Sequence, residues 1–524
     1  MLYALTATAR QCTSRLAASA ATALLLALLL QAALLRTTLA VAAEDIDLPE
    51  LGDSGAGLMS PAEENALGQA WLRSFRARVP LLQDPLTFEY LENLLFALAS
   101  QSELERRQLD LVVVDNPTIN AFAVPGGVVG IHTGLISRAQ TEAQLSSVIT
   151  HELAHLSQRH FARSVEAAKR ANLAGIAGML AGVVLAATTS GDAATAAIAT
   201  SQAAVLDSRL RYSRLHEREA DRIGMQTLDA AGYPASAAAD MFRQMQDAAR
   251  LYGEGIPEFL RTHPITESRI ADAENRARAL TAKPATANID YQLVRARLKV
   301  HGQGDGKASI KHFKFALQQA QQNLSGNGNS ESFSHARPQP HYWQVQQDAA
   351  RYGLALAYHK NSEPDQARIT LQPLLEKIPG RIAYTLLDIE IDLGKKDYQT
   401  AEQRLRDLYA ITPRNYAISM LLAETLLKNK NYSAAQQVLE ELAKVRPKQA
   451  DVWYLLAETQ GLAGDILNLH LSRAEFFLLR GNFGQTRKHL DYALRIAGND
   501  FKVTARIKQR LRDIVASQRM LEQL

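Results

Sequence analysis

Two histidines and a glutamate within one short segment have the types and the spacing of a hydrolytic metal site. The segment runs His-Glu-Leu-Ala-His from His151 to His155. On a helix, residues four positions apart share one face, so the two imidazoles would lie about 6 Å apart and could bind one tetrahedral zinc ion. Glu152 would lie beside the water on that metal and could accept its proton. The pattern predicts peptide-bond hydrolysis, although an isolated motif of this kind also arises by chance.

A catalytic zinc ion needs a third protein ligand, and the acidic segment 217–221 offers two candidates. Glu217 and Asp221 are four residues apart and would again share a helix face. One of them could bind the metal while the other accepts a hydrogen bond from the second ring nitrogen of a liganding histidine. From the residues alone, these two roles remain open between Glu217 and Asp221.

Other polar residues near these motifs are expected to have no metal role. His160 and His216 each lie about 100° or more around their helix from the proposed metal face. Glu219 points to a different face from its acidic neighbours and is expected to be solvated. His132 lies in a predicted strand and could line the cleft.

The elements that must position these residues are predicted to be helices and two short strands. Thr141 and Gln144 form a capping box in front of a helical pattern that runs past Arg163. The apolar, β-branched run 109–114 is typical of a strand, and a second strand is predicted at 128–131. A helix that carries metal ligands beside a small sheet is the expected arrangement.

The first 43 residues have the layout of a cleaved secretory signal peptide. Arg10 and Arg15 precede the apolar run Leu16–Leu35, and small residues close the segment at Ala43. An uncleaved membrane anchor is the alternative, because the apolar run is long. Cleavage after Ala43 would remove Cys12, the only cysteine, so neither a disulfide nor a cysteine-bound zinc site is expected.

Residues 284–524 are predicted to form an all-helical repeat array. Residue types recur every 34 positions, as in Pro379, Pro413 and Pro447 and in Ala367, Ala401 and Ala435. A helix pair with this period resembles the tetratricopeptide repeat (TPR). Stacked helix pairs make a concave binding surface, so this half is expected to dock partners. A flexible loop is predicted at about 323–340.

Composition and one apolar segment bear on the kind of partner. Lysine and arginine number 58 against 54 aspartate and glutamate, and this balance gives no reason to expect a nucleic acid. Leu173–Ala187 is uncharged and rich in alanine and glycine, but shorter than the roughly 20 residues needed to span a bilayer. It is either a buried hairpin or flap, or a segment that touches a membrane surface or a hydrophobic client.

Five ordered motifs together resemble the HtpX-like zinc metallopeptidase family. They are Asn120–Ala123 with Pro125–Gly127, Thr133–Leu135, the histidine motif at 151–155, the acidic motif at 217–221, and Thr262–Pro264 with Arg269. The resemblance implies an α+β, mostly helical chain with a gluzincin-like peptidase domain at 44–283, followed by the TPR solenoid at 284–524. It also implies that the strand after Gly127 borders the cleft and pairs with an extended substrate.

The resemblance assigns roles to the candidate site residues. It implies one zinc ion per chain bound by His151, His155 and Glu217, with Glu152 as general base and Asp221 as the carboxylate behind a ligand. In periplasmic, TPR-bearing members a histidine in a later loop approaches the zinc and gates activity, and His263 matches that place. A fourth protein ligand would displace the catalytic water, so this loop would have to move before cleavage. The alternative is that His263 orients substrate or stabilises the oxyanion.

The resemblance to these members implies a periplasmic endopeptidase that degrades misfolded or stalled outer-membrane proteins and supports their assembly in a chaperone-like way. Its implied partners are those clients and the β-barrel assembly machinery, docked through the TPR array. The rival is a latent or non-proteolytic scaffold in which zinc and His263 lock the site, although a structural zinc site has no use for Glu152. A membrane-embedded prenyl-protein peptidase would need several long apolar spans, and none follows residue 43.

Overall fold

The structure, a computed structural model, describes residues 59–170, 214–251, 258–284, 287–326 and 340–522. The chain divides into the units Met1–Gly57 and Leu58–Leu524, and every described residue belongs to the second. The predicted signal peptide, the apolar segment Leu173–Ala187 and most of the loop at 323–340 lie outside the described residues. Within the described ranges, no helix has the length and apolar character needed to cross a membrane.

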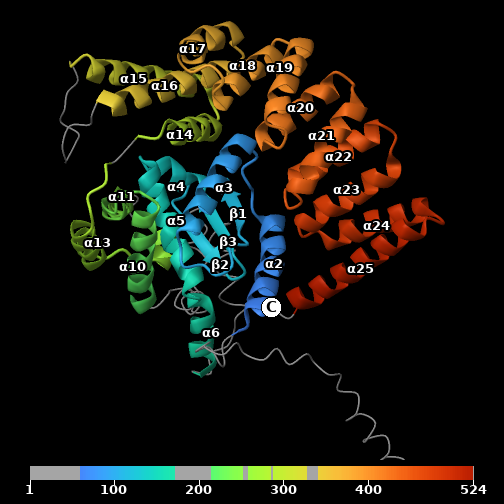
Figure 1. The fold of residues 1–524 in the computed structure, drawn as a ribbon, viewed down its shortest axis with the longest axis horizontal. Coiled ribbons are helices and arrows are strands. Elements are labelled where there is room, and N and C mark those ends of the chain that lie inside the picture. The colour runs from blue at the N-terminus through green and yellow to red at the C-terminus, as the bar shows by residue number, and fades with distance from the viewer. Residues whose placement is uncertain (1–58, 171–213, 252–257, 285–286, 327–339, 523–524) are drawn as a thin grey trace, which may run out of the picture. The chain divides into compact units, whose positions relative to one another are not determined.

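A three-stranded sheet is made of β1 (Asp110–Val114), β2 (Ala121–Val124) and β3 (Val128–His132), in the order β1-β3-β2 (Figure 1). β3 runs parallel to β1 and antiparallel to β2. Because β3 is central and paired on both sides, the expectation that it binds an extended substrate is wrong, and β1 and β2 are the outer strands of this sheet. The tight β2–β3 turn uses Gly126 and Gly127 at φ of 81° and 82°, a region that disfavours residues with a side chain.

The helix that carries the histidine motif is shorter than predicted. The capping box at Thr141 and Gln144 is confirmed, and α5 (Glu142–Ser157) begins there. The chain then turns at Arg159, whose φ of 49° is left-handed, and α6 (His160–Arg170) begins. The guanidinium of Arg159 reaches Oε1 of Glu64 at 3.4 Å and bonds to the carbonyl of Met59. These two contacts with a distant segment stabilise the turn at Arg159, which no neighbouring glycine or proline predicts.

The acidic motif lies on a helix that packs closely against α5. This is α10 (Arg214–Ala230), and it is followed by α11 (Ser236–Leu251), α12 (Glu258–Thr262) and α13 (Glu267–Ala279). A Cβ added at Gly224 would lie 3.0 Å from the backbone of His151, so glycine allows the two helices to approach each other. This close packing of α10 on α5 brings Glu217 next to His151 and His155.

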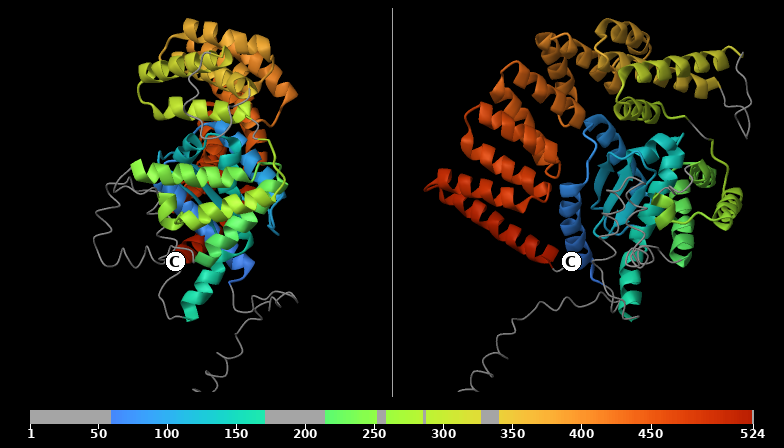
Figure 2. Two further views of the ribbon diagram at one scale, coloured as in Figure 1. Left: turned by 90° about the vertical axis from the view of Figure 1, so that its left-hand side faces the viewer. Right: turned by 180° about the vertical axis from the view of Figure 1, so that it is seen from behind.

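The second half is the all-helical array that the repeat predicts, and the expected fold class is confirmed. From α15 onward, each helix of the array packs against the next one in the chain (Figures 1 and 2). The helices are, in chain order, α14 (Ile289–Gly302), α15 (Gly306–Leu324), α16 (Pro340–Lys360), α17 (Pro364–Lys377), α18 (Ile382–Gly394), α19 (Tyr398–Ile411), α20 (Tyr416–Lys428), α21 (Tyr432–Val445), α22 (Ala450–Leu462), α23 (Ile466–Leu479), α24 (Phe483–Ala497) and α25 (Phe501–Glu522). The repeated alanines Ala367, Ala401 and Ala435 are fully buried, which lets neighbouring helices approach closely.

The array and the peptidase half share apolar contacts within this unit. Helix α14 belongs to both cores, since Tyr291 packs with the cluster around α5 and Leu293 with the first array helices. Leu86 and Phe88 of α3 (Pro85–Ser100) pack against the cluster around α20. Trp71 and Phe75 of α2 (Pro61–Arg78) belong to a separate apolar cluster with side chains from all three strands of the sheet.

Candidate active site

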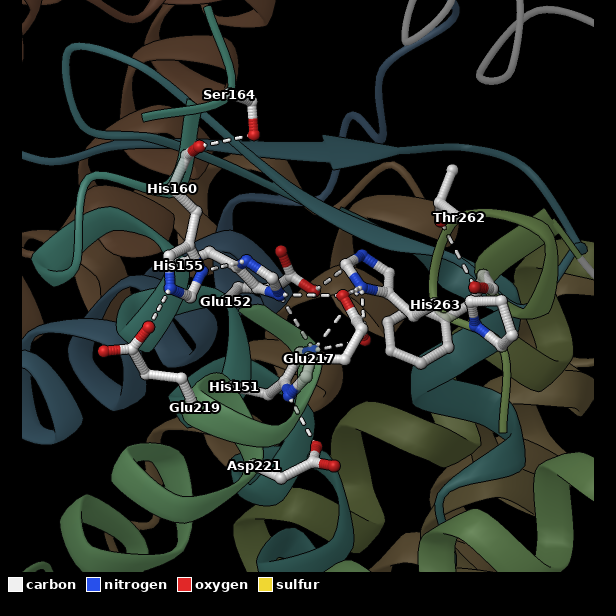
Figure 3. A network of polar contacts seen from close by, with 12 residues as sticks. His151, Glu152, His155, His160, Ser164, Glu217, Glu219, Asp221, Thr262 and His263 are labelled. Atoms are coloured by element: carbon white, nitrogen blue, oxygen red, sulfur yellow. Dashed lines mark hydrogen bonds and ion pairs between the residues drawn. The ribbon is translucent and has the colours of Figure 1, made fainter. Parts of the chain in front are cut away.

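Four buried side chains bring one potential ligand atom each to a common point. They are His151, His155, Glu217 and His263, and these atoms all lie within 4.8 Å of one another (Figure 3). Nε2 of His155 is 3.1 Å from Nε2 of His151, and Nδ1 of His263 is 3.0 Å from Oε1 of Glu217. A tetrahedral zinc site with bonds of about 2.1 Å has ligand atoms about 3.4 Å apart, so the group fits such an ion.

The ionisable side chains of this group interact strongly with one another. Burial acts against ionisation of Glu217, but His263, His151 and His155 hold the pKa of its carboxyl well below the usual value. Burial likewise opposes charge on His151, yet hydrogen bonds to Asp221 and Glu217 raise its pKa to about 10. An ionised carboxylate among imidazoles is a donor set that zinc prefers, and the site holds the predicted ligands together.

Glu152 lies between this group and the free edge of the sheet. Its side chain is 1% exposed, and its Oε1 is 3.6 Å from Nε2 of His263. Burial raises the pKa of Glu152, while the backbone N–H of Ala123 in β2 donates to it. Among the residues that the structure describes, β2 pairs with β3 alone, so Glu152 lies where an extended chain laid along the outer edge of β2 would present its backbone.

Asp221 and Arg269 stand behind the ligand atoms. Oδ1 of Asp221 is 3.0 Å from Nδ1 of His151, the ring nitrogen that faces away from the group. Arg269 donates twice to Asp221, with both contacts at 2.7 Å, and its Nη1 lies 3.0 Å from Oε2 of Glu217. The geometry thus divides the roles left open by the sequence, since Glu217 offers the ligand atom and Asp221 holds the ring of His151.

His263 follows α12 and reaches the group from its far side. Its backbone N–H donates to the carbonyl of Phe259 at 2.7 Å, and the two rings pack with centroids 4.7 Å apart. The N–H of Phe259 in turn donates to the carbonyl of Ile119 at 3.3 Å, which ties α12 to the segment before β2. His263 therefore brings a potential fourth ligand atom to the group.

Two residues that sequence reasoning set aside lie directly beside the group. Nδ1 of His160 is 2.8 Å from Nδ1 of His155, and Nε2 of His160 is 3.1 Å from Oε2 of Glu219. His160 is not among the four potential ligands, as expected, but its ring lies next to His155 because the turn at Arg159 interrupts the helix that the sequence predicted to be continuous. Glu219 was expected to be solvated, but its side chain is 28% exposed and paired. No local signal in the sequence marks this turn.

Comparisons with known proteins agree with the geometry. Residues 85–277 match peptidase family M48, and residues 392–459 match a tetratricopeptide repeat. The beta-barrel assembly-enhancing protease of Escherichia coli (strain K12) is 33% identical over 361 residues, which is 69% of each chain. A putative beta-barrel assembly-enhancing protease of Vibrio cholerae is 34% identical over 68% of each chain. The mitochondrial metalloendopeptidase OMA1 of Arabidopsis thaliana is 31% identical over 33% of this chain and 32% of its own.

Proposed function

Since the chain belongs to peptidase family M48 and carries tetratricopeptide repeats, we propose that it is a periplasmic zinc endopeptidase that degrades misfolded or stalled outer-membrane proteins and supports their assembly. The observation that carries this proposal is the buried group of His151, His155 and Glu217 with Glu152 beside it. A structural metal site would gain nothing from a buried carboxylate with a raised pKa at this place.

The residues of the chain divide the work of hydrolysis. His151, His155 and Glu217 would hold one zinc ion, which when bound supplies Lewis-acid polarisation and a lowered water pKa. Glu152 accepts the proton of the attacking water and passes it to the leaving amine. Asp221 accepts from Nδ1 of His151 and leaves Nε2 of that ring free as a ligand atom.

Substrate would bind along β2. The outer edge of β2 has no strand partner among the described residues, and the Ala123 amide on it points to Glu152. An extended polypeptide can add to such an edge through main-chain hydrogen bonds, and these bonds tolerate many side chains. This broad selectivity suits unfolded clients of differing sequence.

His263 would keep the enzyme latent. Its Nδ1 lies 3.4 Å from Nε2 of His151 and 3.0 Å from Oε1 of Glu217, where it could bind the metal, and its Nε2 faces the carboxylate of Glu152. With that ring in place the catalytic water has no position, so the loop after α12 must move before cleavage. The same contact favours a second candidate function, a non-proteolytic scaffold whose site stays closed.

The client class and the compartment rest on relatives and on the layout of the chain. The name of the Escherichia coli relative refers to β-barrel assembly. The N-terminal segment has the signal-peptide layout that exports a chain from the cytoplasm. We propose that the repeat array docks the client or the β-barrel assembly machinery. If the chain contacts a membrane surface, the proposed contact segment is Leu173–Ala187.

A cleavage time course tests the proposal. The mature chain is incubated with an unfolded outer-membrane β-barrel protein and with its folded form, beside Glu152→Gln, which keeps the size of the side chain but not its basicity. The parent should cut the unfolded client, and both Glu152→Gln and a zinc chelator should abolish cleavage. Cleavage that survives Glu152→Gln would contradict the assigned base.

A further inference from the structure

His155 offers one ring nitrogen to the metal group and the other to a second histidine. Its Nε2 faces His151 and Glu217, at 3.1 Å and 3.5 Å. Its Nδ1 lies 2.8 Å from Nδ1 of His160, a distance that requires a hydrogen bond with one proton between the two atoms. The two histidines of the motif thus have different partners behind them, Asp221 for His151 and His160 for His155.

The chemistry of the partners fixes which atom donates. An ionised carboxylate only accepts, so Nε2 of His160 must donate to Glu219, at 3.1 Å. A neutral His160 then presents a lone pair at Nδ1, and Nδ1 of His155 donates to it. The remaining nitrogen of His155, Nε2, is left as a lone pair directed at the metal group.

Several contacts hold His160 in this orientation. Its side chain is fully buried, and its ring stacks on His216 with centroids 4.3 Å apart and planes 10° apart. It begins α6 directly after the left-handed turn at Arg159, and the hydroxyl of Ser164 donates to its carbonyl at 2.7 Å. Arg163 donates to the same oxygen of Glu219 at 2.9 Å (Figure 3 shows the pair His160 and Glu219).

We propose that His160 and Glu219 form a hydrogen-bonded relay that positions the metal ligand His155 and fixes its tautomer. His160 is a positioning residue, because it contacts the ligand His155 without being one of the four potential metal ligands. The inference rests on the proposed metal site, but it concerns the strength of metal binding, which can be measured without catalysis. Partners of this kind typically contribute about 10- to 100-fold to metal affinity.

The test is the zinc affinity of the full mature chain by competition with a chromophoric chelator, in a Glu152→Gln background that removes proteolysis. His160→Phe keeps an aromatic ring against His216 but has no acceptor, and should weaken zinc binding about 10- to 100-fold. His160→Asn places an amide oxygen near the position of Nδ1 and should recover a large part of that loss. Arg218→Ala, at an exposed neighbour on α10, is the control and should bind zinc as the parent does.

A second measurement separates positioning from general damage. With cobalt in place of zinc, His160→Phe should shift the visible absorption bands, because the geometry around His155 changes, while His160→Asn should resemble the parent. If His160→Phe does not fold, Glu219→Ala, which removes the acceptor at a partly exposed site, should still weaken zinc binding relative to Arg218→Ala.

Two results overturn the relay. One is equal zinc affinity of the parent and a folded His160→Phe, and the other is equal weakening by His160→Phe and His160→Asn, which would mean that the acceptor is irrelevant. These results are distinct from failure of the proposed function, in which the parent binds zinc tightly and yet cuts no client.

Discussion

At the residue scale, the partners of a buried histidine decide in which direction its pKa moves. Burial lowers the pKa of His132 to about 3, and the Nδ1 of this ring is 2.9 Å from the Thr118 hydroxyl. Burial acts in the same direction on His151, but two carboxylates reverse the effect and raise its pKa to about 10. Carboxylate partners therefore distinguish His151 of the candidate site from His132 at the end of β3, whose pKa is shifted by burial.

His132 should make the fold sensitive to mild acid. Its pKa of about 3 in the folded chain lies below the ordinary 6.5, so the unfolded chain binds the proton first as the pH falls. Its contribution to stability is complete above about 6.5 and is lost as the pH falls from there towards 3. The melting temperature should therefore drop less between pH 7 and pH 5 in His132→Asn than in the parent. An equal drop in both chains would contradict this assignment.

Most of the site could be predicted from the sequence, because its residues lie in motifs with fixed spacing. His151, His155, Glu217 and His263 were named in advance, and the structure brings them together. What each does in catalysis is still a prediction. The pair of His160 and Glu219 could not be predicted, because its position depends on a turn held by a contact with a distant segment.

At the element scale, local sequence patterns predicted where the helix α5 begins but not where it ends. The helix start at Thr141 was predicted from two side chains and is confirmed. The break at Arg159 and the edge strand β2 were missed, the first because of a tertiary contact and the second because its four residues are too few to show alternation. The repeated helices were predictable because the same packing recurs every 34 residues.

Gly224 tests how closely α10 must approach α5. Alanine in place of a helical glycine normally stabilises a helix by about 1 kcal/mol. Here the added Cβ would lie 3.0 Å from the backbone of His151, and such overpacking costs about 1–3 kcal/mol. Gly224→Ala should therefore lower the melting temperature and weaken zinc binding.

Gly484→Ala is the matched control for that change. Gly484 lies in α24, where an added Cβ meets only Oδ1 of Asn482, at 3.8 Å. This variant should melt at or slightly above the temperature of the parent. A rise in melting temperature for both glycine variants would show that the approach of α10 to α5 is not tight.

At the scale of the described unit, the array is held on the peptidase half by charge as well as apolar packing. Arg446 at the end of α21 reaches Glu92 at 2.6 Å and Glu89 at 3.4 Å, both on α3. Its guanidinium also lies 4.8 Å from the centre of the Tyr416 ring. The contacts of Arg446 with Glu89 and Glu92 join residues more than 350 positions apart, so no local sequence pattern predicts them. The family and the peptidase class, by contrast, were predicted from motifs and are confirmed.

Removing Arg446 should loosen that junction. The charge-assisted hydrogen bonds of a partly buried arginine are worth about 1.5–3 kcal/mol, so Arg446→Ala should lower the free energy of unfolding by about that amount. Arg406→Ala, which removes an exposed pair with Glu402 within one helix, should change it by at most about 0.5 kcal/mol. Denaturant titration followed by circular dichroism measures both, and equal effects would mean that the charges add nothing to the junction.

The central claim is that this chain is a metallopeptidase held latent by His263. The measurement that tests it most directly is the initial rate at which zinc-loaded His263→Ala cleaves an unfolded β-barrel protein, beside the parent and His263→Ala with Glu152→Gln. The account predicts faster cleavage by His263→Ala than by the parent, and none when Glu152 is also replaced. A folded, zinc-loaded His263→Ala that cuts no faster than the parent would contradict the claim.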